Sequence, residues 1–179
     1  DQESSESEGG NESGLYLGMS TFERNLTYYP AHLISEETLE SYNDIVDNLE
    51  LTTLNGTVLY YSIDEDITSM QSITMPDDIF NVSIVTFTDG LDEGSLSYRR
   101  GVYKTKAEYL DALHTRLANE QVAGLPIKSY AIGLMGTDAQ SNIDEFRTNL
   151  EKIASTPVND NEQYVYEISS INELNSSFE

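Results

Sequence analysis

Short β-type runs alternate with amphipathic helical repeats along most of this chain, and that alternation limits the folds open to it. Val82 to Phe87 is a β-rich run with little polarity, as expected for a central parallel strand covered on both faces. Ile127 to Leu134 and Tyr164 to Ile168 are further strand candidates, each separated from the previous one by a helical repeat. Because this order is typical of βαβ units, the sequence predicts an α/β fold with a largely parallel sheet.

Two adjacent strands are expected before the first helix. They are Leu15 to Phe22 and Leu26 to Ile34, and the polar residues between them form a connection short enough for a hairpin. Pro30 cannot donate a ladder hydrogen bond, so the second strand should lie at an edge of the sheet. A helix capped by Ser35 follows, and its apolar face should lie against the sheet. That face is formed by Leu39, Tyr42, Ile45, Val46 and Leu49.

Further helices are predicted where apolar residues recur every three or four positions. One begins near Thr57, with its apolar residues inward and its acidic residues outward. A capping box at Thr105 opens the next, Ser141 caps a third, and a last box starts at Ser170. In chain order, the inward residues of the first three are Leu59, Ile63, Ile67 and Met70, then Leu110, Leu113 and Leu117, then Ile143, Phe146, Leu150 and Ile153. The outward acids of the first are Asp64, Glu65 and Asp66.

The charge balance excludes several kinds of partner. The chain carries 32 Asp and Glu residues against 9 Lys and Arg, a formal net charge of −23, which opposes binding to nucleic acid and to anionic membrane surfaces. The absence of cysteine rules out disulfides, thiolate catalysis and zinc–sulfur sites. No apolar run approaches the roughly 20 residues needed to span a bilayer, so direct membrane insertion is not expected.

The start of the chain differs in composition from the rest. Asp1 to Gly14 holds only Ser, Glu, Gly, Gln, Asn and Asp, and it offers no apolar surface to offset the entropy of ordering. We therefore predict an acidic tail or linker over residues 1–14 and a single domain over residues 15–179.

Familiar catalytic motifs do not occur in the sequence. No GxGxxG follows a strand, and neither a GxxxxGK[ST] phosphate loop nor a GxSxG nucleophile elbow is present. The two histidines, His32 and His114, are far apart in sequence and have no neighbour at zinc spacing. The motifs thus argue against dinucleotide, P-loop and α/β-hydrolase chemistry.

Two loops should lie where an open parallel sheet binds ligands, beyond the carboxyl ends of its strands. They are Asn55-Gly56-Thr57 and Thr88-Asp89-Gly90. A hydroxyl and a carboxylate that meet there, next to a helix N-terminus, would suit a hard divalent cation such as Mg²⁺. The alternative is that Thr57 is only a helix N-cap and Asp89 only a turn former.

The order of these segments resembles that of the von Willebrand factor type A domain, in the form met in bacterial surface and envelope proteins. LYLGMSTF is similar to that family's second strand, and LTYYPAHLI to its antiparallel edge strand. LNGTVLYYSI resembles the loop with the metal-site threonine, and SIVTFTDGLDEGS the strand that ends in the metal-site aspartate. IKSYAIGLMG resembles the fifth strand, and YVYEISSINELNSSF the closing strand and helix. The resemblance implies a Rossmann-like, three-layer, doubly wound and mostly parallel sheet with one antiparallel edge strand.

The resemblance also implies a function. It places Thr57 and Asp89 in a metal-ion-dependent adhesion site, where Mg²⁺, or Mn²⁺ or Ca²⁺, keeps one coordination position for an acidic side chain of a protein or glycoprotein partner. A domain of this kind is a non-enzymatic interaction and cell-adhesion module. The likeness, together with the abundance of Tyr, Ser and Asn, favours a secreted or cell-envelope location.

The chain departs from the family at its start. The family's first strand lies between the second and the fourth and ends in an Asp-x-Ser-x-Ser motif that supplies the other metal ligands. Asp1-Gln2-Glu3-Ser4-Ser5 matches this motif imperfectly, because Glu3 stands where a serine is required. We therefore expect an N-terminally incomplete domain with an incomplete cation site. Either the missing strand lies upstream in a longer protein, which we favour, or the two halves of the sheet pair directly.

Two other functions are open at this point. A metal-free domain would serve as a structural or assembly module of a cell-envelope protein. A metal-assisted hydrolase would use the acidic cluster Asp89, Asp92 and Glu93 to hold Mg²⁺. Four bases that follow the aspartate loop either steer an acidic partner or only balance nearby acids. They are Arg99, Arg100, Lys104 and Lys106.

Overall fold

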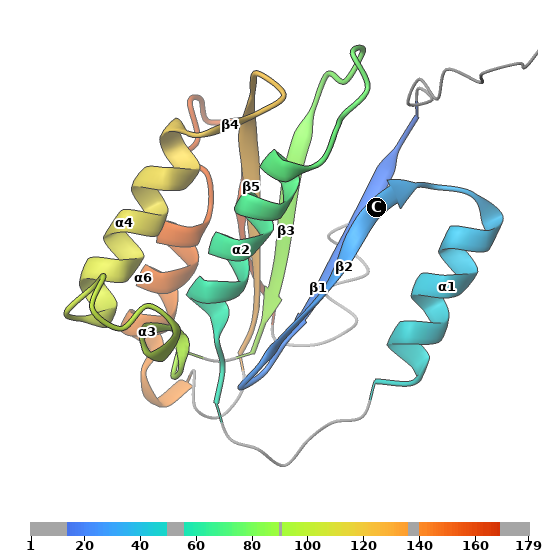
Figure 1. Cartoon of the computed structure of the whole chain (residues 1–179). Coiled ribbons are helices and arrows are strands. Elements are labelled where there is room, and N and C mark those ends of the chain that lie inside the picture. Colours follow the sequence, from blue (N-terminus) through green and yellow to red (C-terminus); the bar gives the residue numbers. More distant parts are fainter. Residues whose placement is uncertain (1–13, 50–55, 90, 136–139, 169–179) are drawn as a thin grey trace, which may run out of the picture.

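The computed structural model describes residues 14–49, 56–89, 91–135 and 140–168. Figure 1 shows helices packed on a mostly parallel sheet, and a separate antiparallel hairpin with a helix of its own. The strands are β1 (Tyr16–Phe22), β2 (Leu26–Leu33), β3 (Val82–Thr88), β4 (Gln121–Val122), β5 (Leu125–Leu134) and β6 (Val165–Ile168). The helices are α1 (Glu36–Asp47), α2 (Leu59–Ser72), α3 (Ser95–Tyr98), α4 (Lys106–Asn119) and α6 (Ile143–Ile153). The α/β class and the predicted strands are confirmed; the helix predicted from Ser170 and the tail over residues 1–13 lie outside the described residues.

Strand β5 is the centre of the larger sheet. It pairs in parallel with β3 along the whole of that strand, and in parallel with β6 on its other side. The short strand β4 turns back antiparallel onto the start of β5. The turn between them has positive φ at both residues, 50° at Ala123 and 79° at Gly124, as two-residue hairpins of type I′ require. Because β3, β5 and β6 run parallel, their carboxyl ends lie at the same edge of this sheet.

Strands β1 and β2 form the expected hairpin, with Phe22 opposite Leu26 next to the turn. Within the described residues β2 has β1 as its single neighbour, which agrees with Pro30 on an edge strand. Strand β1 does not pair with β3, and the hairpin and the larger sheet are therefore two separate sheets. The hypothesis that the two halves of the sheet pair directly is therefore wrong for the part of the chain that the structure describes. Helix α2 contacts both the hairpin and β3.

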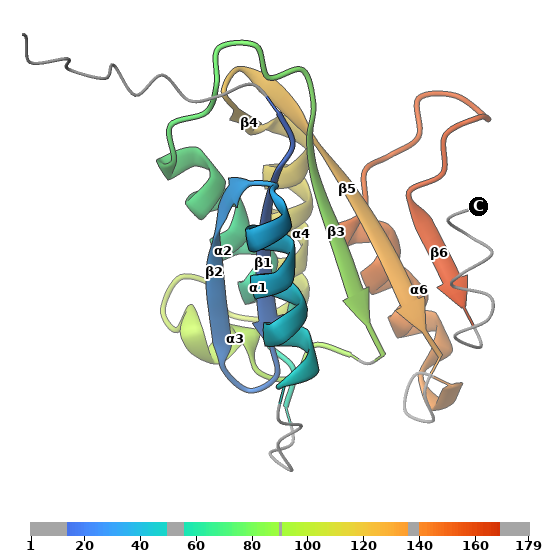
Figure 2. The ribbon, with the colours of Figure 1, turned by 90° about the vertical axis from the view of Figure 1, so that its right-hand side faces the viewer.

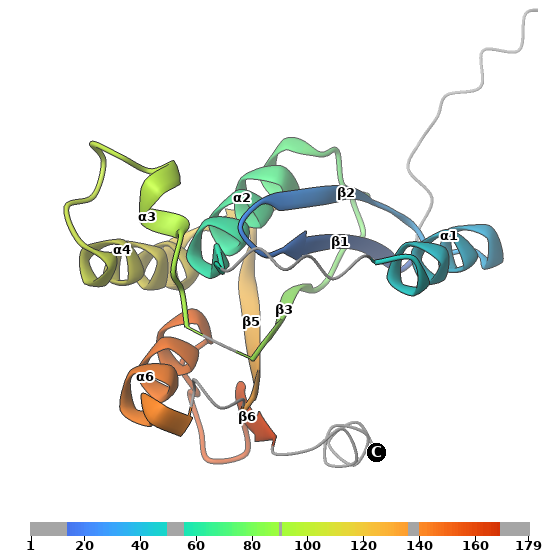
Figure 3. The ribbon, with the colours of Figure 1, turned by 90° about the horizontal axis from the view of Figure 1, so that it is seen from below.

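The core lies between the larger sheet and the helices α2, α4 and α6, which Figures 1 and 3 show on the same side of β3 and β5. Thr105 caps α4, and its Oγ1 accepts a hydrogen bond of 3.1 Å from the Glu108 backbone N–H. Helix α6 begins after Asn142, one residue later than the predicted cap at Ser141. The predicted inward residues that are fully covered are Leu59, Ile63, Ile67, Leu110, Leu113, Leu117, Phe146, Leu150 and Ile153.

Strand β3 is not covered on both faces, contrary to the prediction. Its burial alternates along the whole strand, with Ile84 covered by the helices and Val85 and Phe87 on the opposite face exposed by 49% and 51%. Within the described residues, β5 is the only strand that pairs with β3. The sequence pattern was misleading because both faces of β3 are apolar, although only one is packed.

The apolar face of α1 is also largely open. Ser35 and Thr38 form a reciprocal capping box at its start, as the sequence indicated for Ser35. Tyr42 is buried, and its hydroxyl lies 2.5 Å from the Leu17 carbonyl oxygen and 3.0 Å from that of Pro30. Leu39, Val46 and Leu49 are exposed by between 43% and 52%. Figure 2 shows α1 beside the β1–β2 hairpin, which leaves these three side chains exposed.

Asp64 of α2 does not point outward as predicted. Its side chain is buried and accepts hydrogen bonds from Arg99 Nη2 at 2.6 Å, Arg116 Nη1 at 2.5 Å and the Tyr109 hydroxyl at 3.0 Å. Glu65 and Asp66 are half-buried. Because Arg99 follows α3 and Arg116 lies on α4, Asp64 ties three helices together.

Candidate functional site

The described residues of the two predicted loops lie near the carboxyl edge of the sheet; Asn55 and Gly90 are outside the described residues. Asp89 follows directly on β3, and Thr57 lies two residues before α2. The backbone N–H groups of Glu93 and Gly94 donate to the Thr57 carbonyl oxygen at 2.8 and 2.9 Å. The polypeptide that follows Asp89 is thus joined directly to the Thr57 backbone. We call this part of the molecule, from the end of β3 to the residues before α2, the Thr57–Asp89 rim; a joint role of the two side chains stays a prediction.

Both side chains at this rim are available to a ligand. Asp89 is exposed and Thr57 is half-buried. Neither the Asp89 carboxylate nor the Thr57 hydroxyl has a hydrogen-bond partner among the residues that the structure describes. They contribute one hydroxyl oxygen and one carboxylate, the donor types that a hard divalent cation takes.

The explanation of Thr57 as a helix N-cap is wrong. The N-cap of α2 is Val58, which has no side chain able to cap, and the helix N-terminus is capped instead by the loop after β3. Asp92 Oδ1 accepts a bond of 3.3 Å from the Tyr60 backbone N–H, and Ser95 Oγ accepts one of 2.9 Å from that of Tyr61. Ser95 also donates to Asp92 Oδ1. The first turn of every helix has backbone N–H groups without a partner inside the helix. Two of these groups in α2 therefore donate to side chains that lie 32 and 34 residues further along the chain.

Asp92 is a capping residue and not a solvent-facing ligand. It is 1% exposed, and its second carboxylate oxygen, Oδ2, has no hydrogen-bond partner within the described residues. Burial raises the pKa of Asp92, against hydrogen bonds from Ser95 and Tyr60 that lower it. The described residues contain no group of three or more His, Cys, Asp or Glu side chains arranged to hold a metal ion. The cluster Asp89, Asp92 and Glu93 therefore does not form such a group.

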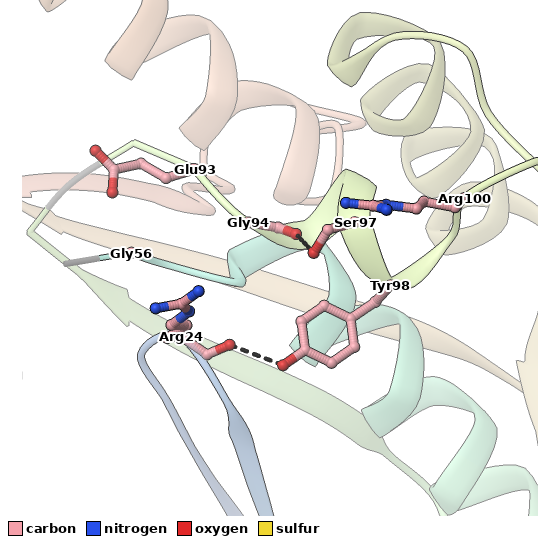
Figure 4. A pocket seen from close by; sticks show the side chains of 7 residues that line it. All are labelled: Arg24, Gly56, Glu93, Gly94, Ser97, Tyr98 and Arg100. Atoms are coloured by element: carbon pink, nitrogen blue, oxygen red, sulfur yellow. Dashed lines mark hydrogen bonds between the residues drawn. The ribbon is translucent and has the colours of Figure 1, made fainter. Parts of the chain in front are cut away.

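A pocket of about 700 Å³ opens beside the Thr57–Asp89 rim, between the β1–β2 turn and α3. Figure 4 shows Arg24 projecting from the hairpin turn and Arg100 from the segment after α3. Between them the Tyr98 hydroxyl donates to the Arg24 carbonyl oxygen at 2.9 Å, and Ser97 Oγ donates to that of Gly94 at 2.7 Å. We call this space the Arg24–Arg100 pocket; its other lining residues are Gly56 and Glu93.

The four bases after the aspartate loop do not act as one group. Arg99 is turned away from the pocket and pairs with Asp64 and Glu65, at 2.6 and 2.5 Å. Lys106 Nζ donates to the Asp92 carbonyl oxygen at 2.6 Å and so fixes the capping loop. Arg100 lines the pocket, whereas Lys104 does not. Arg24, in the predicted turn between the first two strands, lines the pocket opposite Arg100. No sequence signal indicates that two arginines so far apart in the chain lie close together.

Comparisons of the sequence with models of protein families and with curated proteins give no match. Within the described residues, no helix is long and apolar enough to cross a membrane. The fold and the rim are therefore the observations on which a function can be proposed.

Proposed function

We propose that the protein is a non-enzymatic interaction module of von Willebrand factor type A architecture, which binds a protein or glycoprotein partner at the Thr57–Asp89 rim. The observation that supports this proposal is the pair of backbone hydrogen bonds from Glu93 and Gly94 to the Thr57 carbonyl oxygen, which join the loop after β3 to the residues before α2 at the ligand-binding edge of a parallel sheet. The finer architecture that we propose is a three-layer, doubly wound sheet that is N-terminally incomplete. A secreted or cell-envelope location belongs to the same proposal.

The open edges of the two sheets support an incomplete domain. Strand β1 and strand β3 each have one paired neighbour in the described part of the chain. Helix α2 contacts the hairpin and β3 and so holds the two edges in place, while the far face of β3 leaves Val85 and Phe87 exposed. A strand between β1 and β3, with a helix over that face, would complete the sheet and bury these side chains.

The described residues fit a divalent cation only in part. Ca²⁺ takes six to eight oxygen ligands and Mg²⁺ a near-ideal octahedral set. Thr57 and Asp89 offer two donors, and Asp92 is buried at the α2 N-terminus instead of at the rim. We therefore propose that the described residues alone have negligible metal affinity, and that Mg²⁺, Mn²⁺ or Ca²⁺ binds where further oxygen donors join the rim.

Calorimetric titration with Mg²⁺ and with Mn²⁺ tests this proposal. The chain of residues 1–179 should show no saturable binding, whereas a longer form with an Asp-x-Ser-x-Ser strand before Asp1 should bind the cation. That binding should be lost in Asp89→Ala and kept in Asp78→Ala, a matched removal of an exposed acid before β3. Absence of binding by such a longer form would contradict the metal-dependent proposal.

A metal-free structural or assembly role is the second candidate, favoured by the absence of a three-ligand group among the described residues. It predicts that Thr57→Ala leaves partner binding unchanged and that EDTA has no effect. The hydrolase hypothesis has less support, because Asp92, one of its three carboxylates, is buried and caps α2. A phosphoester screen in the presence of Mg²⁺ should give no turnover above that of Asp89→Ala.

A further inference from the structure

We infer that the Arg24–Arg100 pocket is a receptor for a single carboxylate group of an acidic peptide, bound without a metal ion. This inference deepens the proposed function, since it rests on the protein being an interaction module and assigns the partner's carboxylate to two arginines. It does not depend on the cation, because neither arginine is a metal ligand.

The pairing of the arginines is the first argument. The chain has five arginines, and three of them form ion pairs: Arg99 with Asp64 and Glu65, Arg116 with Asp64 and Glu120, and Arg147 with Glu167. The guanidinium groups of Arg24 and Arg100 have no acceptor among the described residues, although the chain holds 32 acids. Both unpaired guanidinium groups line the same pocket.

The backbone that carries Arg24 is held in place. The Tyr98 hydroxyl donates to the Arg24 carbonyl oxygen, and the Val58 N–H donates to that of Glu23 at 2.8 Å. Gly56 lies against the aliphatic part of the Arg24 side chain: a Cβ on Gly56 would be 3.7 Å from the Arg24 Cβ. Gly56 has φ of +137°, which L side chains rarely adopt. The backbone of the turn is thus already ordered before a ligand binds, and only the exposed Arg24 side chain is left to order.

The opposite wall is equally fixed. The Tyr98 ring stacks on Tyr61 of α2, with 4.5 Å between ring centroids and 19° between ring planes. Arg99, the residue before Arg100, lies over the Tyr61 ring, with its guanidinium carbon 5.1 Å from the ring centroid. It is also held by its ion pair with Asp64. Because its neighbour in sequence is anchored on α2, Arg100 is directed to the other side, where Figure 4 shows it beside Ser97.

The lining selects the ligand. A guanidinium group donates two parallel hydrogen bonds to a carboxylate, and two such groups with Glu93 give the pocket a local charge of +1. One monovalent anion balances this charge, whereas a phosphate dianion would leave an excess of negative charge in a protein of net charge −23. The Tyr98 ring, 42% exposed, offers an apolar wall for the methylene groups that carry a carboxylate. A Glu or Asp side chain or a peptide C-terminus has this chemistry.

The test is titration of the protein with small carboxylates, followed by NMR of the arginine Nε–Hε groups, in buffers freed of divalent cations with a chelating resin. The probes are N-acetylglutamic acid α-amide, whose single carboxylate is that of the side chain, N-acetylglycine for a peptide C-terminus, and inorganic phosphate. We expect saturable shifts of Arg24 and Arg100 with at least one carboxylate, whose identity distinguishes the two sources. Arg24→Gln and Arg100→Gln should each weaken binding about tenfold, and Arg24→Lys should weaken it as well, because the two-donor fork is lost.

Lys128→Gln is the matched control, since Lys128 is an exposed base on the first half of β5, away from the rim. It removes the same charge and should leave carboxylate binding unchanged. The inference is overturned by the absence of saturable shifts, by phosphate binding tighter than carboxylate, or by equal weakening in Lys128→Gln. Because these buffers hold no divalent cations, a failure here is distinct from a failure of the Mg²⁺ titration with Asp89→Ala.

Discussion

Replacing Asp64 by asparagine should destabilise the protein by about 3 kcal/mol. Asp64 is 6% exposed, and its carboxylate accepts hydrogen bonds from two arginines and a tyrosine. Removing one member of a buried ion pair costs about 3–5 kcal/mol, because the remaining charge loses its compensation. Arg99 and Arg116 keep Glu65 and Glu120 as partners, and their side chains are 29% and 19% exposed, which places the expected cost at the lower end of that range.

Urea denaturation followed by circular dichroism measures this cost, with Glu65→Gln as the control. Glu65 pairs with the same Arg99 at 2.5 Å, but its side chain is 31% exposed, so its loss should cost less than about 1 kcal/mol. For a chain of this size, 3 kcal/mol corresponds to a fall in Tm of about 6–12 °C. A loss in Asp64→Asn equal to that in Glu65→Gln would refute the assignment of Asp64 as the buried link between the helices.

The pH dependence of the same variant gives a second check. Burial by itself raises the pKa of Asp64, but hydrogen bonds from Arg116, Arg99 and Tyr109 outweigh burial, and the pKa lies below the ordinary value of 3.8. A lowered pKa in the folded state stabilises the protein above the unfolded pKa, and that stabilisation is lost as the pH falls through the folded pKa. The stability difference between the protein and Asp64→Asn should therefore be constant near pH 7 and shrink below about pH 4.

Three further changes test other parts of the structure. Burial raises the pKa of Asp66 from 3.8 to about 6, although a hydrogen bond from Ser20 lowers it. Asp66→Asn should therefore stabilise the protein by up to about 3 kcal/mol above pH 6, because it removes a carboxylate that is costly to ionise in the folded state. Below pH 4 the substitution should have no such effect, and urea denaturation at the two pH values measures the difference. Ser95→Ala should cost about 2 kcal/mol in the same assay, because the Tyr61 N–H loses its acceptor, whereas Ser97→Ala, which removes an exposed hydroxyl from the same segment, should change stability by less than about 0.5 kcal/mol. Gly133→Ala should lower Tm at a cost of about 1–3 kcal/mol, because its Cβ would lie 2.5 Å from Leu150 Cδ1 and 2.7 Å from Phe146 Cζ; an unchanged Tm would contradict this packing.

Local signals in the sequence were sufficient for the elements and their inward faces. The Thr105 cap and the repeat of Leu110, Leu113 and Leu117 belong to one helix, so the interactions that they predict lie within a few residues. Coverage of a strand depends instead on what other segments place over it. The apolar pattern of β3 predicted two covered faces, but Val85 and Phe87 on one face are exposed by 49% and 51%.

The candidate site shows the same limit. Strand and helix order predicts that the loop after β3 lies next to the residues before α2, and the bonds from Glu93 and Gly94 to the Thr57 carbonyl oxygen agree with this. The capping of α2 by Asp92 and Ser95 could not be predicted, since the partners are 32 and 34 residues apart and Thr57 is a residue type that ordinarily caps. Asp64 was misplaced for a related reason: an acidic residue on a helix is solvated unless distant arginines, here Arg99 and Arg116, reach it.

The rim does not depend on a continuous sheet. A ladder between β1 and β3 is absent from the described residues, yet Thr57 stays next to the loop after β3, because Glu93 and Gly94 bind its carbonyl oxygen. The Asp92 and Ser95 caps hold the start of α2 against the same loop, and the Glu23 carbonyl ties the hairpin turn to Val58. The backbone positions of Thr57 and of the hairpin turn that carries Arg24 are thus set by hydrogen bonds at one end of α2. A segment added between the sheets would meet a rim whose backbone is already ordered on the α2 side, which lowers the ordering cost of completing the site.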